Sequence, residues 1–239
     1  VFGGAPACQA GGFSTDTWTF DFANMRWQRM DPSGPRPRAT PGIVTAYDSN
    51  TGKVFIHDDL NLYTYTYSSN SFQLVASNSS GVDYHLSGVI DPVRKKFVMF
   101  GGGEAWIYDI SGAGSARQAL STTGGSAIIN SSYPGLTYDP ASGRIVGWTG
   151  GNTVYSLNLD TRTWTASTFS GGPGAAQSLG TYKRFNYSPA SGVFVLANGM
   201  NQDAYTLRHN TGSAPPPPPP PSFDFSLSNG GNRSITQGA

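Results

Sequence analysis

A unit of apolar and polar positions recurs four times along the chain, in residues 47–59, 90–102, 138–151 and 187–199. Each copy begins with an aromatic or aliphatic residue, continues through a short polar turn into an aromatic and β-branched run, and closes on small or polar residues. The first apolar positions of successive copies are separated by 43, 48 and 49 residues. A nearly fixed period of this length indicates a repeat architecture in which each repeat is one supersecondary unit.

One copy divides clearly into four strands. Residues 135–139 and 144–149 are joined by the turn Asp-Pro-Ala-Ser-Gly, and residues 153–159 and 163–168 follow as two further strands. Pro early in the turn and Gly at its end suit the φ angles of a hairpin loop. A strand-rich repeat of this period predicts an all-β fold, a β-propeller of four-stranded antiparallel blades with essentially no helix.

Aromatic residues mark the start of the fourth strand in three copies. Trp27 and Phe72 are 45 residues apart, and Phe72 and Trp164 are 92 apart, which is two periods. No aromatic residue holds that position after residues 106–120, so we expect a looser outer strand there. Apolar residues of the strands should lie largely between blades. The residues expected there are Trp18, Trp27, Phe55, Val98, Phe100, Trp106, Tyr108, Val146, Tyr155, Trp164 and Val195.

A glycine pair after the second strand, an aromatic residue in the third and Trp at the start of the fourth resemble the Kelch-repeat β-propeller family. The pair is intact at residues 3–4, 101–102 and 150–151. It is replaced by Asp-Asp at residues 58–59 and by Asn-Gly at residues 198–199. The resemblance implies a Kelch-like propeller.

The resemblance covers residues 1–208 and is partial at both ends. About five blades are represented: the first lacks its first strand and the last lacks its fourth. The propeller is therefore predicted to be incomplete. We take Val1 not to be the native start and expect a C-terminal segment of a larger ring, with one or two blades upstream.

Three regions are predicted in all. Residues 1–210 form the Kelch-like propeller segment, and residues 211–222 form a linker whose seven prolines favour a semi-rigid polyproline II rod. Residues 223–239 alternate Phe, Phe and Leu with polar residues and resemble the first strand of an immunoglobulin-like module appended to secreted bacterial proteins. Covalently linked neighbouring modules are therefore expected partners.

Composition narrows the classes of partner. Charged residues make up 12% of the chain and the formal net charge is +1, which gives no electrostatic reason to expect nucleic acid. No apolar run approaches the roughly 20 residues that span a bilayer. The single cysteine, Cys8, excludes an internal disulfide framework. The low charge and module-like tail favour a secreted or cell-surface location, although the segment carries no signal peptide.

Propeller topology places the connections between second and third strands on the same face as the connections between blades. Aromatic side chains beside amides and carboxylates on this loop face suit sugar recognition. The alternative for any one of them is an ordinary solvated rim. The predicted ligand-binding residues are Asp58, Asp59, Asn61, Tyr84, His85, Glu104, Tyr133, Asn152, Arg184, Asn201 and Asp203. Arg36, Arg38, Tyr182, Lys183 and Gln202 lie on the same predicted loops.

Two carboxylates, Asp58 and Asp59, stand where the resemblance predicts Gly-Gly. They could be oxygen ligands for calcium, or Asp could serve there because it tolerates left-handed turns. No cofactor is expected apart from this calcium. We expect replacement of both residues by Gly to leave the fold intact. The histidines show no paired metal-ligand spacing, and the resemblance implies a structural role for His85.

The sequence favours a non-catalytic secreted propeller that binds a carbohydrate or a protein surface through its loop face. No catalytic residue is predicted. The first alternative is a copper-radical oxidase of the galactose oxidase type, which is also built on a Kelch-like propeller. That family uses a cysteine cross-linked to tyrosine and two histidine ligands, and Cys8 does not lie in a matching motif. The second alternative is a purely structural spacer.

Overall fold

The computed structural model describes residues 1–4, 12–112 and 116–209. Cys8, the proline-rich linker and the predicted C-terminal module lie outside these residues. The described residues are nearly all strand and turn, with a single four-residue helix, α1 (Ser126–Ile129), and one 3-10 turn, η1 (Tyr182–Arg184). None of the helices described is long and apolar enough to cross a membrane.

Seventeen strands form five antiparallel sheets. A two-stranded sheet comprises β1 (Thr17–Asp21) and β2 (Arg26–Met30). The next comprises β3 (Ile43–Asp48), β4 (Lys53–Asp58), β5 (Leu62–Thr66) and β6 (Ser71–Ala76). The third comprises β7 (Ser87–Asp91), β8 (Lys96–Gly101), β9 (Glu104–Asp109) and β10 (Gln118–Ala119). The fourth comprises β11 (Gly135–Asp139), β12 (Arg144–Trp148), β13 (Thr153–Asn158) and β14 (Thr163–Thr168). The last comprises β15 (Phe185–Ser188), β16 (Val193–Leu196) and β17 (Tyr205–Leu207).

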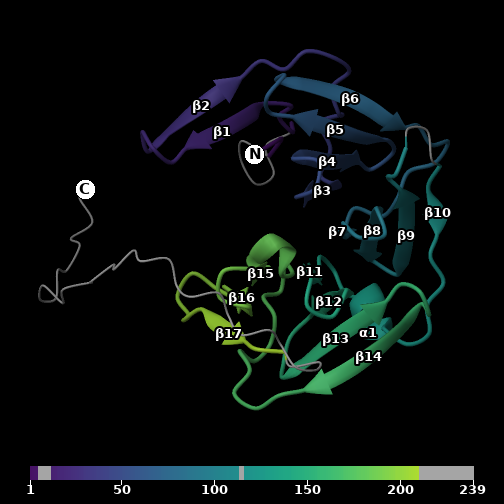
Figure 1. The fold of residues 1–239 in the computed structure, drawn as a ribbon, viewed down its shortest axis with the longest axis vertical. Helices are drawn as coiled ribbons and strands as arrows, with labels where there is room; N and C mark the ends of the chain where they lie inside the picture. The colour runs from purple at the N-terminus through teal and green to yellow at the C-terminus, as the bar shows by residue number, and fades with distance from the viewer. Residues whose placement is uncertain (5–11, 113–115, 210–239) are drawn as a thin grey trace, which may run out of the picture.

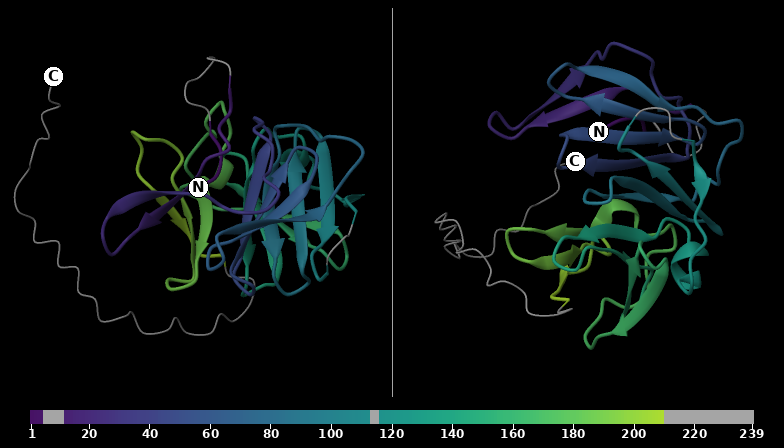
Figure 2. Two further views of the ribbon diagram at one scale, coloured as in Figure 1. Left: turned by 90° about the horizontal axis from the view of Figure 1, so that it is seen from above. Right: turned by 45° about the vertical axis from the view of Figure 1, so that its right-hand side comes forward.

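Four sheets of three or four strands follow one another around a common centre, and the β1–β2 ribbon precedes them (Figure 1). The first strands of these sheets, β3, β7, β11 and β15, lie nearest the centre, and β3 contacts β7, β7 contacts β11, and β11 contacts β15. Figure 2 shows the strands of neighbouring sheets standing side by side. This arrangement is a β-propeller, as the sequence repeat predicted.

The strand boundaries follow the sequence pattern closely. The strands predicted at residues 135–139 and 163–168 match β11 and β14, and those predicted at 144–149 and 153–159 end one residue later than β12 and β13. The expected looser outer strand is β10, which has only two residues. Within the residues that the structure describes, the last sheet has three strands, as expected.

Aspartates close the hairpins between first and second strands. The Asp91 carboxylate accepts a hydrogen bond from the Val93 N–H at 3.0 Å, and the Asp139 carboxylate accepts one from the Ala141 N–H at 3.0 Å. Asp48 closes the equivalent turn of the second sheet. A hydrogen bond from the backbone N–H two residues later to the aspartate carboxylate stabilises the turn locally. This local stabilisation explains why the polar turn recurs along the chain.

The core consists of apolar layers between successive sheets. Phe55 of β4 packs against Phe97 of β8 with ring centroids 6.3 Å apart, and Trp164 of β14 packs against Phe100 of β8 at 5.2 Å. Of the residues expected between blades, six are buried: Phe55, Val98, Phe100, Tyr108, Val146 and Trp164. Trp18, Trp106, Tyr155 and Val195 are half-buried.

The prediction for Trp27 was wrong, because this side chain is 56% exposed. The aromatic residue at this position packs on the preceding sheet: Trp164 contacts Phe100 of the third sheet, and Phe72 contacts Phe2. Trp27 belongs to the first sheet of the described residues, so it has no preceding sheet to cover it. The same sequence position is therefore buried or exposed according to the neighbouring sheet.

Candidate functional site

Four aromatic side chains lie in a row on the loop face, in the connections that lead into β7, β11 and β15. Tyr84 and His85 have ring centroids 3.8 Å apart, and His85 and Tyr133 are 5.3 Å apart. Tyr133 stacks on Tyr182 at 4.2 Å with an interplanar angle of 21°. These four residues are called the aromatic row below. It includes three of the predicted residues, drawn from two different blade connections, and extends to Tyr182.

Main-chain hydrogen bonds between connections set the spacing of the row. The Tyr133 N–H donates to the His85 carbonyl at 2.7 Å, and the Tyr182 N–H donates to the Tyr133 carbonyl at 3.0 Å. Tyr133 and Tyr182 have φ values of 48° and 52°, in the left-handed region that bulky residues rarely adopt. Strain of this kind persists where the surrounding structure imposes it, and it gathers at functional sites.

The approach of two connections depends on Gly180. Its φ is +94°, and a Cβ at this position would lie 2.6 Å from the Ser132 carbonyl oxygen and 2.7 Å from the Tyr133 Cβ. Only glycine allows the backbone to pass so close with this φ. The glycine therefore brings Tyr182 within stacking distance of Tyr133.

Acidic side chains hold the middle of the row. Asp83 Oδ1 accepts a hydrogen bond from the His85 N–H at 2.7 Å and lies 2.7 Å from His85 Nδ1. Glu104 Oε2 accepts from the Asp83 N–H at 3.0 Å and from the Trp106 indole N–H at 2.7 Å. Glu104, a predicted ligand-binding residue, therefore positions Asp83, which in turn orients the His85 ring.

The ends of the row are its accessible parts. Tyr84 is 49% exposed and Tyr182 is 44% exposed, whereas His85 and Tyr133 are half-buried. Burial and the neighbouring Tyr182 raise the pKa of Tyr133 to about 12, so its hydroxyl stays protonated at physiological pH. Because the Tyr84 and Tyr182 side chains are exposed, a ligand could stack on the free face of either ring.

Tyr182 forms one wall of a hollow of about 660 Å³. Polar side chains from two connections, β14 to β15 and β16 to β17, share its lining: Gln177, Arg184, Asn201 and Gln202. The Arg184 guanidinium donates through Nε to the Thr181 carbonyl at 3.1 Å and through Nη2 to the Gly180 carbonyl, which fixes its position while leaving the Nη1 N–H groups available. Arg184 and Asn201 were predicted from sequence. Gln177 was not, because it lies in a long connection with no strand pattern to place it.

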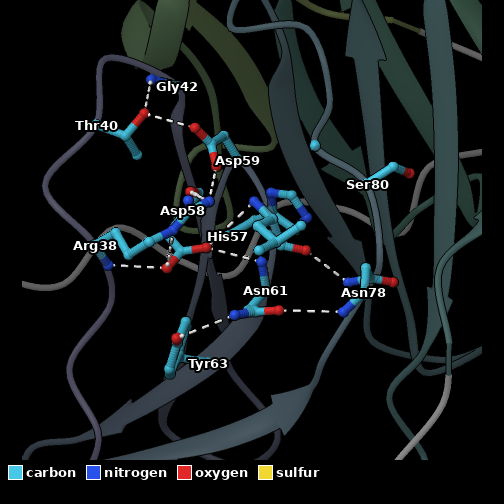
Figure 3. Close-up of polar contacts among 12 residues, drawn as sticks. Arg38, Thr40, Gly42, His57, Asp58, Asp59, Asn61, Tyr63, Asn78 and Ser80 are labelled. Carbon is cyan, nitrogen blue, oxygen red and sulfur yellow. Dashed lines mark hydrogen bonds and ion pairs between the residues drawn. The ribbon is translucent and has the colours of Figure 1, made fainter.

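The predicted carboxylate Asp58 is fully buried and satisfied by the protein (Figure 3). It accepts hydrogen bonds from the backbone N–H groups of Arg38 at 2.9 Å, Leu60 at 3.2 Å and Asn61 at 2.8 Å. Arg38 Nε also lies 3.4 Å from Asp58 Oδ2. Asp58 thus closes its own loop and ties it to the preceding connection.

Asp59 also binds this loop to the preceding connection, on the side nearer the aromatic row. It has a φ of 70°, its carboxylate pairs with the Arg38 guanidinium, and it accepts a hydrogen bond from the Thr40 hydroxyl at 2.9 Å. Gly42 lies between it and the row: a Cβ there would be 3.2 Å from the Asp59 Cβ and 3.3 Å from the Tyr84 Cβ. The interpretation of Asp as a residue that tolerates left-handed turns fits this geometry.

Asn61 belongs to a polar network beneath the same loop (Figure 3). Its Oδ1 accepts from the Asn78 N–H at 3.1 Å, and Asn78 donates through Nδ2 to the Tyr108 hydroxyl oxygen at 2.8 Å. His57 Nε2 lies 3.0 Å from that hydroxyl. Burial, followed by the positive charge of Arg117, lowers the pKa of His57 to about 3, so the ring is neutral and can accept the phenol hydrogen.

The structure offers no assembled metal centre within residues 1–4, 12–112 and 116–209, where no three His, Cys, Asp or Glu side chains come together. Calcium at Asp58 and Asp59 would have to compete with Arg38 for the carboxylate oxygens. His57 and His85 have separate surroundings, and His209 packs near Phe169 at 5.8 Å.

Two predicted residues lie apart from the row and the hollow. Asn152 borders a different, mainly apolar cavity that Trp148, Phe169 and Phe185 also line. Asp203 is exposed and lines neither cavity. Asn152 and Asp203 therefore do not share a cavity with Arg184 and Asn201.

Comparison with known proteins supports the fold alone. No model of a protein family matches the chain, and no curated relative matches it. A chain of the solved Nidogen/Laminin complex is similar with a TM-score of 0.50 and 12% identity, over 76% of this chain and 70% of that chain. The structure of YjhT is similar with a TM-score of 0.52 and 10% identity, over 86% and 80%. The chain is thus a β-propeller protein.

Proposed function

We propose that this propeller is a non-catalytic carbohydrate-binding module whose site is the free face of Tyr182 and the polar hollow beside it. The observation that carries the proposal is the placement of Tyr182, stacked on Tyr133 at 4.2 Å and 44% exposed toward a hollow of about 660 Å³. We also propose that the protein is secreted and is covalently linked to neighbouring modules.

The chemistry of the hollow matches that of a sugar ring. A pyranose has a face of C–H groups that packs on an aromatic ring and an edge of hydroxyls that both donate and accept hydrogen bonds. Gln177, Asn201 and Gln202 carry side-chain amides, which also donate and accept, and Arg184 adds donors. The volume lies within the range of about 300–1,000 Å³ typical of small-ligand pockets.

A glycan microarray probed with the full chain tests the proposal. Hits are then titrated by calorimetry against wild type, Tyr182→Ala and the control Tyr67→Ala, which removes a tyrosine that is 63% exposed and borders neither the row nor the hollow. Loss of about 80 Å² of apolar contact is worth about 2 kcal/mol. We expect at least tenfold weaker binding for Tyr182→Ala and no change for Tyr67→Ala.

Other outcomes overturn the proposal in distinguishable ways. A glycan that binds Tyr182→Ala as tightly as wild type places the site elsewhere. Capture of a defined protein in place of any glycan favours a protein-binding propeller. Stoichiometric copper with peroxide production from an alcohol favours an oxidase, and the absence of any ligand favours a structural spacer.

A further inference from the structure

The central channel, which the inner strands surround, opens on the face opposite the loop face through a further cavity of about 670 Å³. Residues of the four inner strands β3, β7, β11 and β15 line it, together with the hairpins that follow them. Three tyrosines at equivalent positions, Tyr47, Tyr138 and Tyr187, stand around its mouth. Because each ends or nearly ends an inner strand, the repeat itself builds this aromatic collar.

Lys183 enters the cavity from the other end of the channel. It follows Tyr182 on the loop face, yet its ammonium group donates to the carbonyl of Gly88 on the inner strand β7. Lys183 is the only charged residue among those that line the cavity. No acidic side chain in the described parts of the chain lies within ion-pair distance of its Nζ.

Lys183 is an exposed residue, so small molecules can reach its side chain through the cavity. Its ammonium group lies against the inner strand β7, where it donates to the Gly88 carbonyl. Partial loss of water around the ammonium lowers the pKa of Lys183 to about 8. An ammonium in such a place is stabilised by any anion that enters, because attraction between charges is stronger where water is partly excluded.

The aspartates near the mouth of the cavity do not pair with the Lys183 ammonium. Asp48, Asp91 and Asp139 stand at the hairpins around the mouth, but each is buried and accepts hydrogen bonds from its own turn. None of the three lines the cavity. The lysine therefore has hydroxyl and aromatic neighbours in the cavity and, among the described residues, no anionic partner.

We propose that the channel is a second binding site, which takes a small ring-bearing carboxylate with its anionic group on Lys183 and its ring among Tyr47, Tyr138 and Tyr187. Hydroxyls of Thr45 and the tyrosines lie in the same lining and can bind further polar groups. Two ligand sources share this chemistry, an acidic sugar such as a uronate and an aromatic carboxylic acid. The site is independent of the proposed glycan site on the loop face.

Calorimetry with D-glucuronate, benzoate and neutral methyl glucoside tests the assignment. We expect at least one acid to bind wild type and the neutral sugar to show no binding in this cavity. Lys183→Met should weaken binding of the acid at least tenfold. Lys53→Met is the matched control: it removes one positive charge near the same hairpins, outside the cavity lining, and should leave binding unchanged. The preferred acid identifies the source.

A measurement on the wild-type protein guards against a folding defect in Lys183→Met. Reductive methylation followed by peptide mass spectrometry reports the reactivity of each lysine, and the bound acid should protect Lys183 at least fivefold relative to Lys53. Gln177→Ala, which alters only the loop face, should leave this protection intact even if it abolishes glycan binding. Absence of binding by both acids, equal binding by Lys183→Met, or unprotected Lys183 would each overturn the proposal.

Discussion

Replacement of Asp58 tests whether the loop face is held by buried hydrogen bonds. The side chain is fully buried, and its carboxylate accepts from the backbone N–H groups of Arg38, Leu60 and Asn61. In Asp58→Ala these three donors lose their acceptor. The Asp58→Asn variant keeps one oxygen that can still close the local turn, but its amide group cannot accept from Arg38.

The magnitude follows from these contacts. A hydrogen bond to a charged group contributes about 1.5–3 kcal/mol, and a buried donor left without a partner costs about 1–3 kcal/mol. The ion pair with Arg38 adds little, because the Arg38 side chain is 50% exposed and solvent screens it. We expect Asp58→Ala to lower the free energy of unfolding by about 3–5 kcal/mol and Asp58→Asn by about 1–3 kcal/mol.

Urea denaturation followed by tryptophan fluorescence measures these differences. The control is Asp59→Ala, whose carboxylate is 30% exposed and binds only side chains, and it should cost about 1 kcal/mol or less. This expected cost differs from the expectation drawn from sequence alone, in which Gly at both positions leaves the fold intact. A loss below about 0.5 kcal/mol in Asp58→Ala would refute the reasoning, since ordinary surface substitutions already change the free energy of unfolding by that much.

Two further predictions concern the core. The pKa of His57 is lowered to about 3, below the ordinary value of 6.5, so the unfolded chain binds a proton that the folded protein does not. Stability should therefore fall as pH drops from about 6.5 toward 3, by up to about 1.4 kcal/mol per pH unit, and His57→Gln should lack this part of the slope in urea titrations. Trp164→Ala should cost about 3–5 kcal/mol and Trp27→Ala under about 1 kcal/mol, although both residues begin equivalent strands. Equal costs in denaturant unfolding would contradict the packing of this position on a preceding sheet.

The sequence by itself determined the repeat and most strand boundaries. Alternation of side chains across a strand and the turn chemistry of residues such as Asp139 act over two to five residues, so they can be read directly from the chain. The short β10 was also predictable, because the aromatic residue that anchors its counterparts is missing.

The burial of individual side chains depended on contacts with neighbouring sheets, which the sequence pattern does not identify. Trp27 and Trp164 occupy the same position in their repeats, yet only Trp164 has a sheet to pack against in the described residues. Asp58 was read as a tolerant turn residue, but the backbone of Arg38, twenty residues earlier, makes it a buried acceptor. Contacts across such separations are fixed by the packing of sheets, which local sequence does not reveal.

In the two candidate sites, too, the sequence predicted which loops carry the residues, whereas the tertiary structure decided which side chains meet. Sequence placed Tyr84, His85 and Tyr133 on one face, but the stacking that joins them requires hydrogen bonds between separate blade connections. Lys183 lies on the same predicted loop as Tyr182, and nothing in the chain indicates that its side chain runs down the channel to Gly88, 95 residues away. The fold decides this direction, because closing the inner strands around a centre creates a channel that no single repeat contains.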